Sequence, residues 1–293
     1  MGIRARLVPY LFVGGAAVYL LVFTATPLLR GALLSFTDTK LLNPYGGEYV
    51  GFENYRDLLA DERFASSVLT TVLYTACTVA GALVLGTAAA FAINDGFRGR
   101  AVVRAVLTMP WAVPSIAVVL VFTWIFNVGD GVANRSLAVL GIGQRGWLID
   151  PDLGLLSVTV VSVWKVFPFI MLVVLAALQS VPAEVRESAR VDGADRLTTM
   201  REIVLPHIAP TLRILALLMT IWSLRRFDII YLLTGGGPLD ATNTLVINVY
   251  REAFGNSDLG RAAALGMLGL CLSLVVTLVY FVVERRAARA EAR

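Results

Sequence analysis

Six long apolar blocks limit the folds open to this chain of 293 residues. They cover about residues 10–34, 64–94, 105–129, 153–181, 208–233 and 262–283. A helix of roughly 20 residues crosses a hydrocarbon core, and blocks this long predict helices that satisfy their own backbone groups in lipid. Only 16% of the residues are charged, well below the share in a soluble globular protein. We therefore expect an all-α membrane protein with six transmembrane helices in a single domain, residues 1–293.

The basic residues are shared unequally between the two sets of segments that flank these blocks. One set holds most of them: Arg4, Arg6, Arg98, Arg100, Arg104, Arg186, Arg190, Arg196, Arg201, Arg213, Arg285, Arg286, Arg289 and Arg293. Because lysine and arginine are enriched in cytoplasmic loops, both termini and the segment 182–206 are predicted to be cytoplasmic. Arg4 and Arg6 also precede an apolar run, as in a signal peptide. The run is long and no clear cleavage site follows it, so we expect a retained span.

Few residues offer chemistry for catalysis or metal binding. Cys77 and Cys271 fall inside apolar blocks, where we expect buried thiols that act as small hydrophobes. A single histidine, His207, cannot build a metal cluster or a catalytic triad. No Gly-rich phosphate loop of Walker type occurs, so any ATP must be bound by another chain. The cytoplasmic arginines account for the net charge of +4, and we expect no metal, cofactor or nucleic-acid partner for this chain.

The segment 182–206, "PAEVRESARVDGADRLTTMREIVLP", is strongly charged although it lies between two apolar blocks. Pro182 suits the first turn of a helix, and Gly193 is expected to end it. A second short helix is expected after Asp195, its N-cap, with Pro206 at its end. Small residues at the bend allow another surface to approach closely, which favours a docking element. The alternative is an amphipathic helix that lies among lipid headgroups.

This segment resembles the EAA loop of permease subunits from binding-protein-dependent ABC importers. Every spacing of that pattern is kept, and the matching residues are Glu187, Ala189, Gly193, Ile203, Leu205 and Pro206; Ser188 replaces one alanine of the pattern. The stretches "MPWAVPSIAVVLVFTWIFN" and "FDIIYLLTGGGPLDATNTLVINVYREAF" look like the carbohydrate branch, which contains maltose-type and glycerol-phosphate-type permeases. The resemblance implies the ABC importer type I permease fold with a cytoplasmic coupling helix, in a bacterial or archaeal plasma membrane.

The resemblance also implies the partners of the chain. In that family the loop inserts into a cleft on the ATPase: Glu187 would make the charge contact, Ala189 and Gly193 would allow the close fit, and Asp192 would orient the bend. The implied partners are a second paralogous permease, two ATP-binding subunits that hold ATP and Mg, and an external solute-binding protein.

The same resemblance implies a sugar path through the bundle. The positions that match the substrate-lining residues of maltose-type relatives are Trp111, Ser115, Lys165, Val166, Phe169, Met219, Trp222, Ser223 and Arg226. Arg225 and Arg226 stand where neutral residues are common in the family. They either face the cavity, or snorkel to an interface, or pair with Asp228. Some family members lack a permease site altogether.

The leading hypothesis is a subunit that moves a disaccharide of the trehalose or maltose type and is itself no enzyme. A glycerol-phosphate or other sugar-phosphate importer is the alternative, since Lys165 and Arg226 could form an anion site. A membrane-embedded transferase, which usually needs paired carboxylates, and an exporter or channel half are less favoured by the loop pattern.

Overall fold

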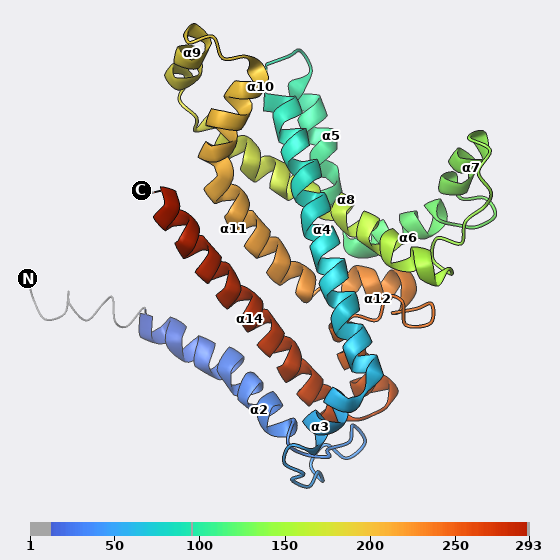
Figure 1. Cartoon of the computed structure of the whole chain (residues 1–293). Coiled ribbons are helices and arrows are strands. Elements are labelled where there is room, and N and C mark those ends of the chain that lie inside the picture. Colours follow the sequence, from blue (N-terminus) through green and yellow to red (C-terminus); the bar gives the residue numbers. More distant parts are fainter. Residues whose placement is uncertain (1–12, 95, 292–293) are drawn as a thin grey trace, which may run out of the picture. The chain divides into compact units, whose positions relative to one another are not determined.

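The computed structural model describes residues 13–94 and 96–291 (Figure 1). The described residues form helices joined by turns and a few isolated β-bridges. In chain order, the helices are a π-helical turn Leu21–Ala25, α2 Thr26–Leu34, α3 Glu53–Ala60, α4 Glu62–Asn94, α5 Arg100–Ala112, α6 Ser115–Ile125, α7 Val132–Val139, α8 Pro151–Gln179, α9 Ala183–Val191, α10 Arg196–Thr199, a π-helical turn Met200–Val204, α11 Leu205–Leu224, α12 Asp228–Thr234, α13 Leu245–Tyr250, a π-helical turn Arg251–Gly255 and α14 Leu259–Glu291.

Five helical stretches are long and apolar enough to cross a membrane, and a bent pair of helices makes a sixth. The five stretches are Val13–Leu34, Glu62–Asn94, Pro151–Gln179, Leu197–Leu224 and Leu259–Arg285. The expected first span, about 10–34, begins in residues 1–12, which lie outside the described residues together with Arg4 and Arg6. Cys77 and Cys271 lie in spans but are exposed in the isolated chain, so the expectation of buried thiols is wrong.

The expected third span, about 105–129, is not one continuous helix. It consists of α5 and α6, whose axes differ by 99°. Val113 adopts an extended conformation, with φ −71° and ψ 133°, and Pro114 follows it. A proline disfavours the helical conformation of the residue before it, which explains the break.

The expected fifth span, about 208–233, is also interrupted. Helix α11 ends at Leu224, and α12 begins only at Asp228. The expected stop at Pro206 is wrong as well, because the helix runs on from Leu197 to Leu224 through that residue. Pro206 lies in the first turn of α11, where a missing N–H removes no helical hydrogen bond.

The contacts divide the chain into two compact units, which are described separately. The first combines Met1–Ser66 with Asn248–Leu272, and the second combines Ser67–Ile247 with Ser273–Arg293. The expectation of a single domain stays a prediction.

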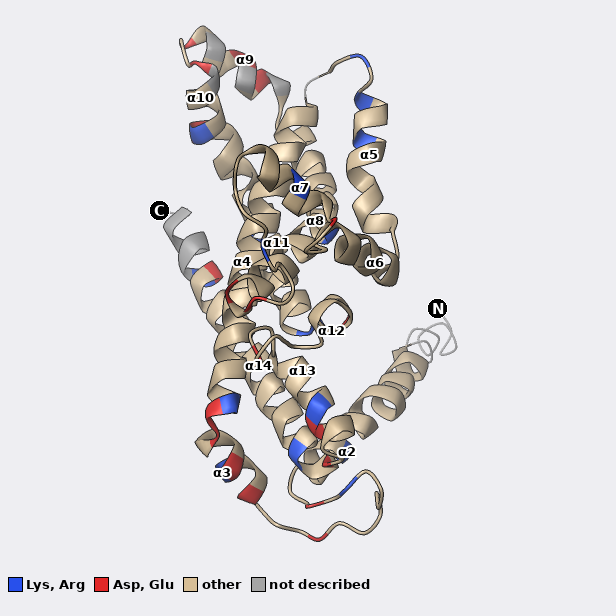
Figure 2. Cartoon of the chain, turned by 90° about the vertical axis from the view of Figure 1, so that its right-hand side faces the viewer, with Lys and Arg blue, Asp and Glu red and all other residues tan. Residues whose placement is uncertain are grey.

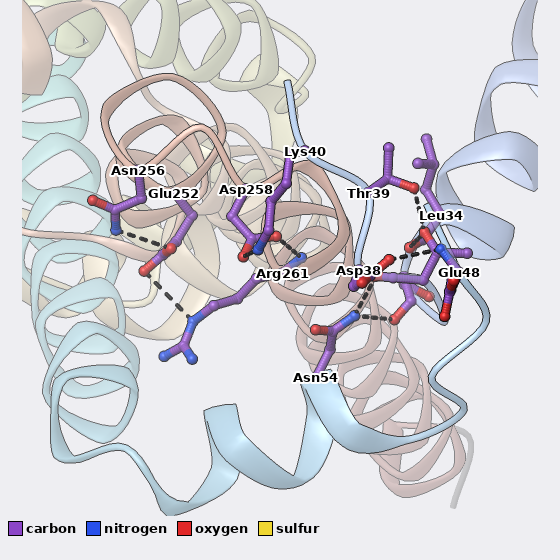
Figure 3. Close-up of polar contacts among 12 residues, drawn as sticks. Leu34, Asp38, Thr39, Lys40, Glu48, Asn54, Glu252, Asn256, Asp258 and Arg261 are labelled. Carbon is purple, nitrogen blue, oxygen red and sulfur yellow. Dashed lines mark hydrogen bonds and ion pairs between the residues drawn. The ribbon is translucent and has the colours of Figure 1, made fainter. Parts of the chain in front are cut away.

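In the first unit, ion pairs connect the segment after α2 to the start of α14 (Figure 3). Lys40 Nζ lies 2.5 Å from Asp258 Oδ2. The guanidinium of Arg261 lies 2.7 Å from Asp61 Oδ2 and 3.6 Å from Glu252 Oε1. These pairs stabilise the polar end of the unit, where the apolar α14 begins.

The second unit has two apolar clusters. Residues of α4, α8 and α11 form one of them, and residues of α4, α6, α8, α12 and α13 form the other. Inside the second cluster, the Tyr74 hydroxyl and Ser162 Oγ are 2.8 Å apart, so the buried polar groups satisfy each other. Long stretches of α4, α8 and α11 carry no charge, whereas charged residues gather at α9 and the first turn of α5 (Figure 2).

Glycines let α4 approach α8 closely. A Cβ placed on Gly86 would lie 2.7 Å from Ile170 Cβ and 2.9 Å from the Phe167 carbonyl oxygen, too close for any real Cβ atom. A Cβ on Gly266, in α14, would meet nothing within 4 Å. The close packing of α4 on α8 therefore depends on the missing side chain at Gly86.

We expect Gly86→Ala to lower the free energy of unfolding by about 1–3 kcal/mol, because overpacking a close helix contact forces side chains and backbone apart. Gly266→Ala is the matched control and should be neutral or slightly stabilising, since alanine favours the helix. Thermal unfolding of the purified protein in detergent measures both. Equal stabilities of the two variants would contradict the close packing.

Candidate functional site

A cavity of about 450 Å³ lies in the second unit, among α5, α8, α11 and α12. Its lining residues are Trp111, Lys165, Val166, Trp222, Arg225, Arg226 and Asp228. They surround the two helix breaks, one after α5 and one after α11. The breaks bring polar backbone and charged side chains into an otherwise apolar bundle, where such groups are tolerated when they line a cavity.

Three aromatic rings cluster at this cavity. The ring centroid of Trp111 lies 5.1 Å from that of Phe169 and 5.8 Å from that of Trp222, and the rings are stacked in both pairs. Phe169 and Trp222 are 5.4 Å apart and tilted. Trp111 is 37% exposed, so part of its ring is open to a ligand. Flat apolar rings beside hydrogen-bonding groups can bind a molecule that has both apolar faces and hydroxyls.

Lys165, on α8, is buried and caps the end of α5. Its Nζ donates to the carbonyl oxygens of Pro110 at 3.1 Å and Trp111 at 3.2 Å, and also to that of Val113. The last carbonyls of a helix lack partners within the helix, and a cation is favoured at that end of the helix dipole. Lys165 therefore stabilises the bend and fixes the backbone of Trp111 beside the cavity.

Arg226 and Asp228 form an ion pair in the cavity wall, with 3.8 Å between Nη1 and Oδ1. The side chain of Arg226 is 17% exposed and that of Asp228 is 41% exposed. Two of the alternatives for the arginines thus occur together: Arg226 pairs with Asp228 and also lines the cavity. Arg225 is exposed and lines the same cavity.

The other predicted substrate residues lie near the cavity without lining it. Met219 and Ser223 are buried on α11, and Phe169 reaches the cavity only through its ring contacts with Trp111 and Trp222. Ser115 is the first residue of α6, beyond the bend. The structure thus brings together the charged and tryptophan positions, but not the two serines.

The predicted docking segment forms two short helices at one end of the second unit, the end where α4 finishes and α5 begins (Figure 1). Gly193 has φ +84°, in the left-handed region that favours glycine. The N–H of Ala194 donates to the Ala189 carbonyl at 2.9 Å, as in a Schellman helix end. The expected helix end at Gly193 is confirmed.

The second of these helices begins at the expected residue. Asp195 Oδ1 accepts a hydrogen bond of 2.7 Å from the Thr198 N–H, which confirms the N-cap. Hydrogen bonds from the side chain and main chain of Thr198 lower the pKa of the Asp195 carboxyl. This stabilisation is present above the ordinary pKa of aspartate and is lost as the pH falls through the lowered pKa.

A hollow of about 420 Å³ lies between the two halves of this segment. Its lining residues are Glu184, Val185, Ser188, Ala189, Asp192 and Ile203. Ala189 is 8% exposed, so it is covered within the chain, whereas Glu187 and Gly193 are exposed. A Cβ on Gly193 would meet nothing within 4 Å, which leaves the bend open to another surface.

Sequence reasoning missed the residue that organises the segment between α6 and α8. Asn134 is 3% exposed. Its amide nitrogen donates to the carbonyls of Val128 and Arg145, both at 3.0 Å, and its oxygen accepts from Arg145 N and Trp147 Nε1, both at 3.0 Å. Asn134 lies in the short helix α7, and an asparagine in a connecting segment gives no sequence signal that distinguishes this role from an exposed polar position.

Residues 82–289 match the family described as the inner membrane component of binding-protein-dependent transport systems. The chain belongs to this family. It is 35% identical over 280 residues to the sulfoquinovosyl glycerol transport system permease protein SmoG of Agrobacterium fabrum, covering 96% of this chain and 91% of that protein. It is 33% identical over 276 residues to the trehalose/maltose transport system permease protein MalF of Thermococcus litoralis, covering 94% and 93%.

The fold agrees with this membership. A bacterial alginate ABC transporter, solved in complex with an alginate pentasaccharide-bound periplasmic protein, has a chain that superposes with a TM-score of 0.85 at 22% identity, covering 97% of this chain and 96% of that one. The chain has the type I fold of ABC importer permeases and is a multi-pass membrane subunit rather than an enzyme. The transferase alternative is therefore set aside.

We expect Lys165→Met to lower the free energy of unfolding by about 1–3 kcal/mol, because buried carbonyls at the end of α5 lose their charged donor. Lys165→Arg, which keeps a cation at this helix end, should retain more of the stability. Thermal unfolding of the purified protein compares the two variants. A Lys165→Met variant as stable as the parent would show that Lys165 does not stabilise the bend.

Proposed function

We propose that this chain is a permease subunit of an ATP-driven sugar importer, and that the cavity beside the two helix breaks contacts the sugar. The observation that carries the proposal is the joint lining of the cavity by tryptophans and charged groups inside an apolar bundle. A volume of about 450 Å³ falls in the usual range of roughly 300–1,000 Å³ for small-molecule sites. The cargoes that the names of SmoG and MalF print, sulfoquinovosyl glycerol and trehalose/maltose, support a sugar.

The cargo under this proposal is a disaccharide or a glycoside of similar size. Trehalose and maltose are the neutral candidates, and the name of the Thermococcus relative supports them. A sugar phosphate, such as a glycerol-phosphate compound, is the second candidate. The observation that favours it is the pair of arginines, Arg225 and Arg226, in the cavity wall.

The proposed partners follow from the docking segment. Glu187 contacts the ATPase, Gly193 gives a bend that fits closely against the ATPase, and Asp192 orients that bend. Ala189, which is buried within the chain, packs inside the segment. The partners are two ATP-binding subunits that hold ATP and Mg, a second paralogous permease and an external solute-binding protein. In a bacterial or archaeal plasma membrane, this arrangement puts the segment and both termini in the cytoplasm.

We expect Glu187→Ala and Gly193→Asp to abolish uptake and to weaken copurification of the ATPase, while membrane insertion stays normal. Glu187 is exposed and available for a charge contact. An aspartate at Gly193 would add a side chain to a left-handed residue, which costs roughly 1–2 kcal/mol, and a charge at the bend. Radiolabelled sugar uptake and affinity pull-down of the assembled importer measure the effects.

Glu53→Ala is the control for this experiment, since Glu53 is also an exposed acid, begins α3 and belongs to the first unit rather than to the docking segment. It should leave uptake and copurification unchanged. Normal uptake in both Glu187→Ala and Gly193→Asp would exclude the docking role.

We expect Trp222→Ala to weaken sugar binding by roughly 10-fold, because removing an aromatic face that contacts the ligand costs about 1–2 kcal/mol. Trp124→Ala is the matched control: Trp124 is a tryptophan of α6 that is 61% exposed and does not line the cavity. Calorimetry measures the affinity of both variants for the sugar, each in the assembled importer in nanodiscs. Equal affinities in the two variants would remove the cavity from the sugar path.

A further inference from the structure

The charges around the cavity do not balance. Three of its lining residues are basic, namely Lys165, Arg225 and Arg226, and only Asp228 is acidic. An unbalanced charge within a membrane span is expensive, because little water is available to solvate it. The hydrogen bonds and ion pairs of these four residues show which of them carry the uncompensated positive charge.

Lys165 does not carry the excess. Its ammonium already donates to three carbonyls at the end of α5, where the helix dipole supplies about half a negative charge. These bonds use all three hydrogens of a lysine ammonium. A ligand that took one of them would have to break the cap of the bend.

The arginines are less well satisfied. Asp228 lies 3.8 Å from Arg226 Nη1, a longer distance than that of a hydrogen-bonded ion pair. Arg226 Nε is buried and has no hydrogen-bond partner within the described residues. The side chain of Arg225 has no ion pair or hydrogen bond within residues 13–94 and 96–291. Asp228 therefore pairs only with Arg226, at a long distance, and leaves the charge of Arg225 uncompensated within the described residues.

We infer that the cavity selects a sugar that carries an anionic group, a carboxylate, sulfonate or phosphate, which binds to Arg225 and Arg226 while its ring lies against Trp111 and Trp222. The inference rests on the proposed sugar site and deepens it. Guanidinium groups present several N–H donors in a planar fork that matches such oxyanions. The anion supplies the missing negative charge. Lys165, whose hydrogen bonds are already made, keeps the cavity wall in place without contacting the anion.

An acidic residue of the second permease is the alternative source of the missing charge. In that case the anion site is already filled in the assembled importer, and the cargo need not be charged. The two sources differ in one observable: only an anionic cargo makes the affinity depend on the charge of the sugar.

The test measures binding of matched sugar pairs to the assembled importer in nanodiscs, without the external binding protein, so that the permease alone selects. The pairs are sulfoquinovosyl glycerol with glucosylglycerol, trehalose 6-phosphate with trehalose, and cellobiouronate with cellobiose. We expect the anionic member of at least one pair to bind roughly 10-fold more tightly or better, as charge-assisted hydrogen bonds predict. The pair with the largest affinity ratio identifies the anionic group that the cavity prefers. That ratio should fall as the salt concentration is raised.

Variants assign the preference to the arginines. Arg226→Gln should reduce the affinity ratio within the preferred pair to near 1, and Arg226→Lys should retain part of it. Asp228→Asn should increase the ratio, because it removes the carboxylate that competes for Arg226. Arg135→Gln, in an exposed outer segment where Arg135 pairs with Asp130 at 3.3 Å, is the control and should change nothing.

The outcomes separate the two proposals. Equal affinity within all three pairs overturns the anionic cargo and leaves the sugar site standing. A preference that survives in Arg226→Gln and Arg225→Gln also overturns it, since another residue would then bind the anion. If none of the six sugars binds, the proposed sugar site and the anionic cargo both fail.

Discussion

The structure around the cavity depends on one requirement, which is that the backbone carbonyls freed by the break after α5 must be satisfied inside an apolar bundle. Water cannot do this in the hydrocarbon region, so a side chain must. Lys165 reaches from α8 and donates to carbonyls of Pro110, Trp111 and Val113. Because the bend is held in this way, α5 and α6 can turn by 99° with these three carbonyls paired, and the turn creates a wall on which Trp111 lines the cavity. A buried lysine that first looks like a ligand for the cargo is thus better understood as the support of the site.

The second helix break has the opposite character. Helix α11 ends at Leu224 and α12 begins at Asp228, so the charged side chains of Arg225, Arg226 and Asp228 line the same cavity. At the break after α5, the positive charge of Lys165 is satisfied by hydrogen bonds to backbone carbonyls. At the break after α11, Arg225 and Arg226 add positive charge, which Asp228 compensates only in part. The two breaks therefore give the cavity its two properties: a fixed aromatic wall on one side and an electrostatic preference on the other. A single uninterrupted helix at either place would remove one of these properties.

The sequence was sufficient for the number of spans, for the two short helices between residues 182 and 206 and for the helix end at Gly193, because these depend on block length, spacing and local backbone preference. It also selected the residues that line the cavity: Lys165, Arg225, Arg226 and Asp228 are ionisable residues inside apolar blocks, and Trp111, Val166 and Trp222 follow from the family resemblance. It failed at two prolines whose local preference allows more than one structure, and at two side chains whose roles depend on tertiary contacts. The Val113–Pro114 dipeptide signals a break, but hydropathy alone treats residues 105–129 as one span. Pro206 was expected to stop a helix that in fact runs through it, because proline is equally suited to a first turn. The role of Lys165 depends on acceptors 52–55 residues away in the sequence, and that of Asn134 on backbone and indole groups that the fold of its own segment brings around it, so no local pattern identifies these partners.

The chain order gives a physical route from the docking segment to the cavity. Helix α8 carries Lys165 and ends at Gln179, directly before the segment, and α11 begins at Leu205, directly after it, and ends beside Arg225. The segment is thus held at both ends by the two helices that form the cavity walls. Residues of α8 and α11 also share one apolar cluster, so displacing the segment displaces both walls as packed bodies rather than as independent helices. Under the proposed function, a displacement of the segment at Glu187 and Gly193 therefore reaches the cavity through α8 and α11, and ATP bound to a partner alters the hold on a cargo without any contact with it.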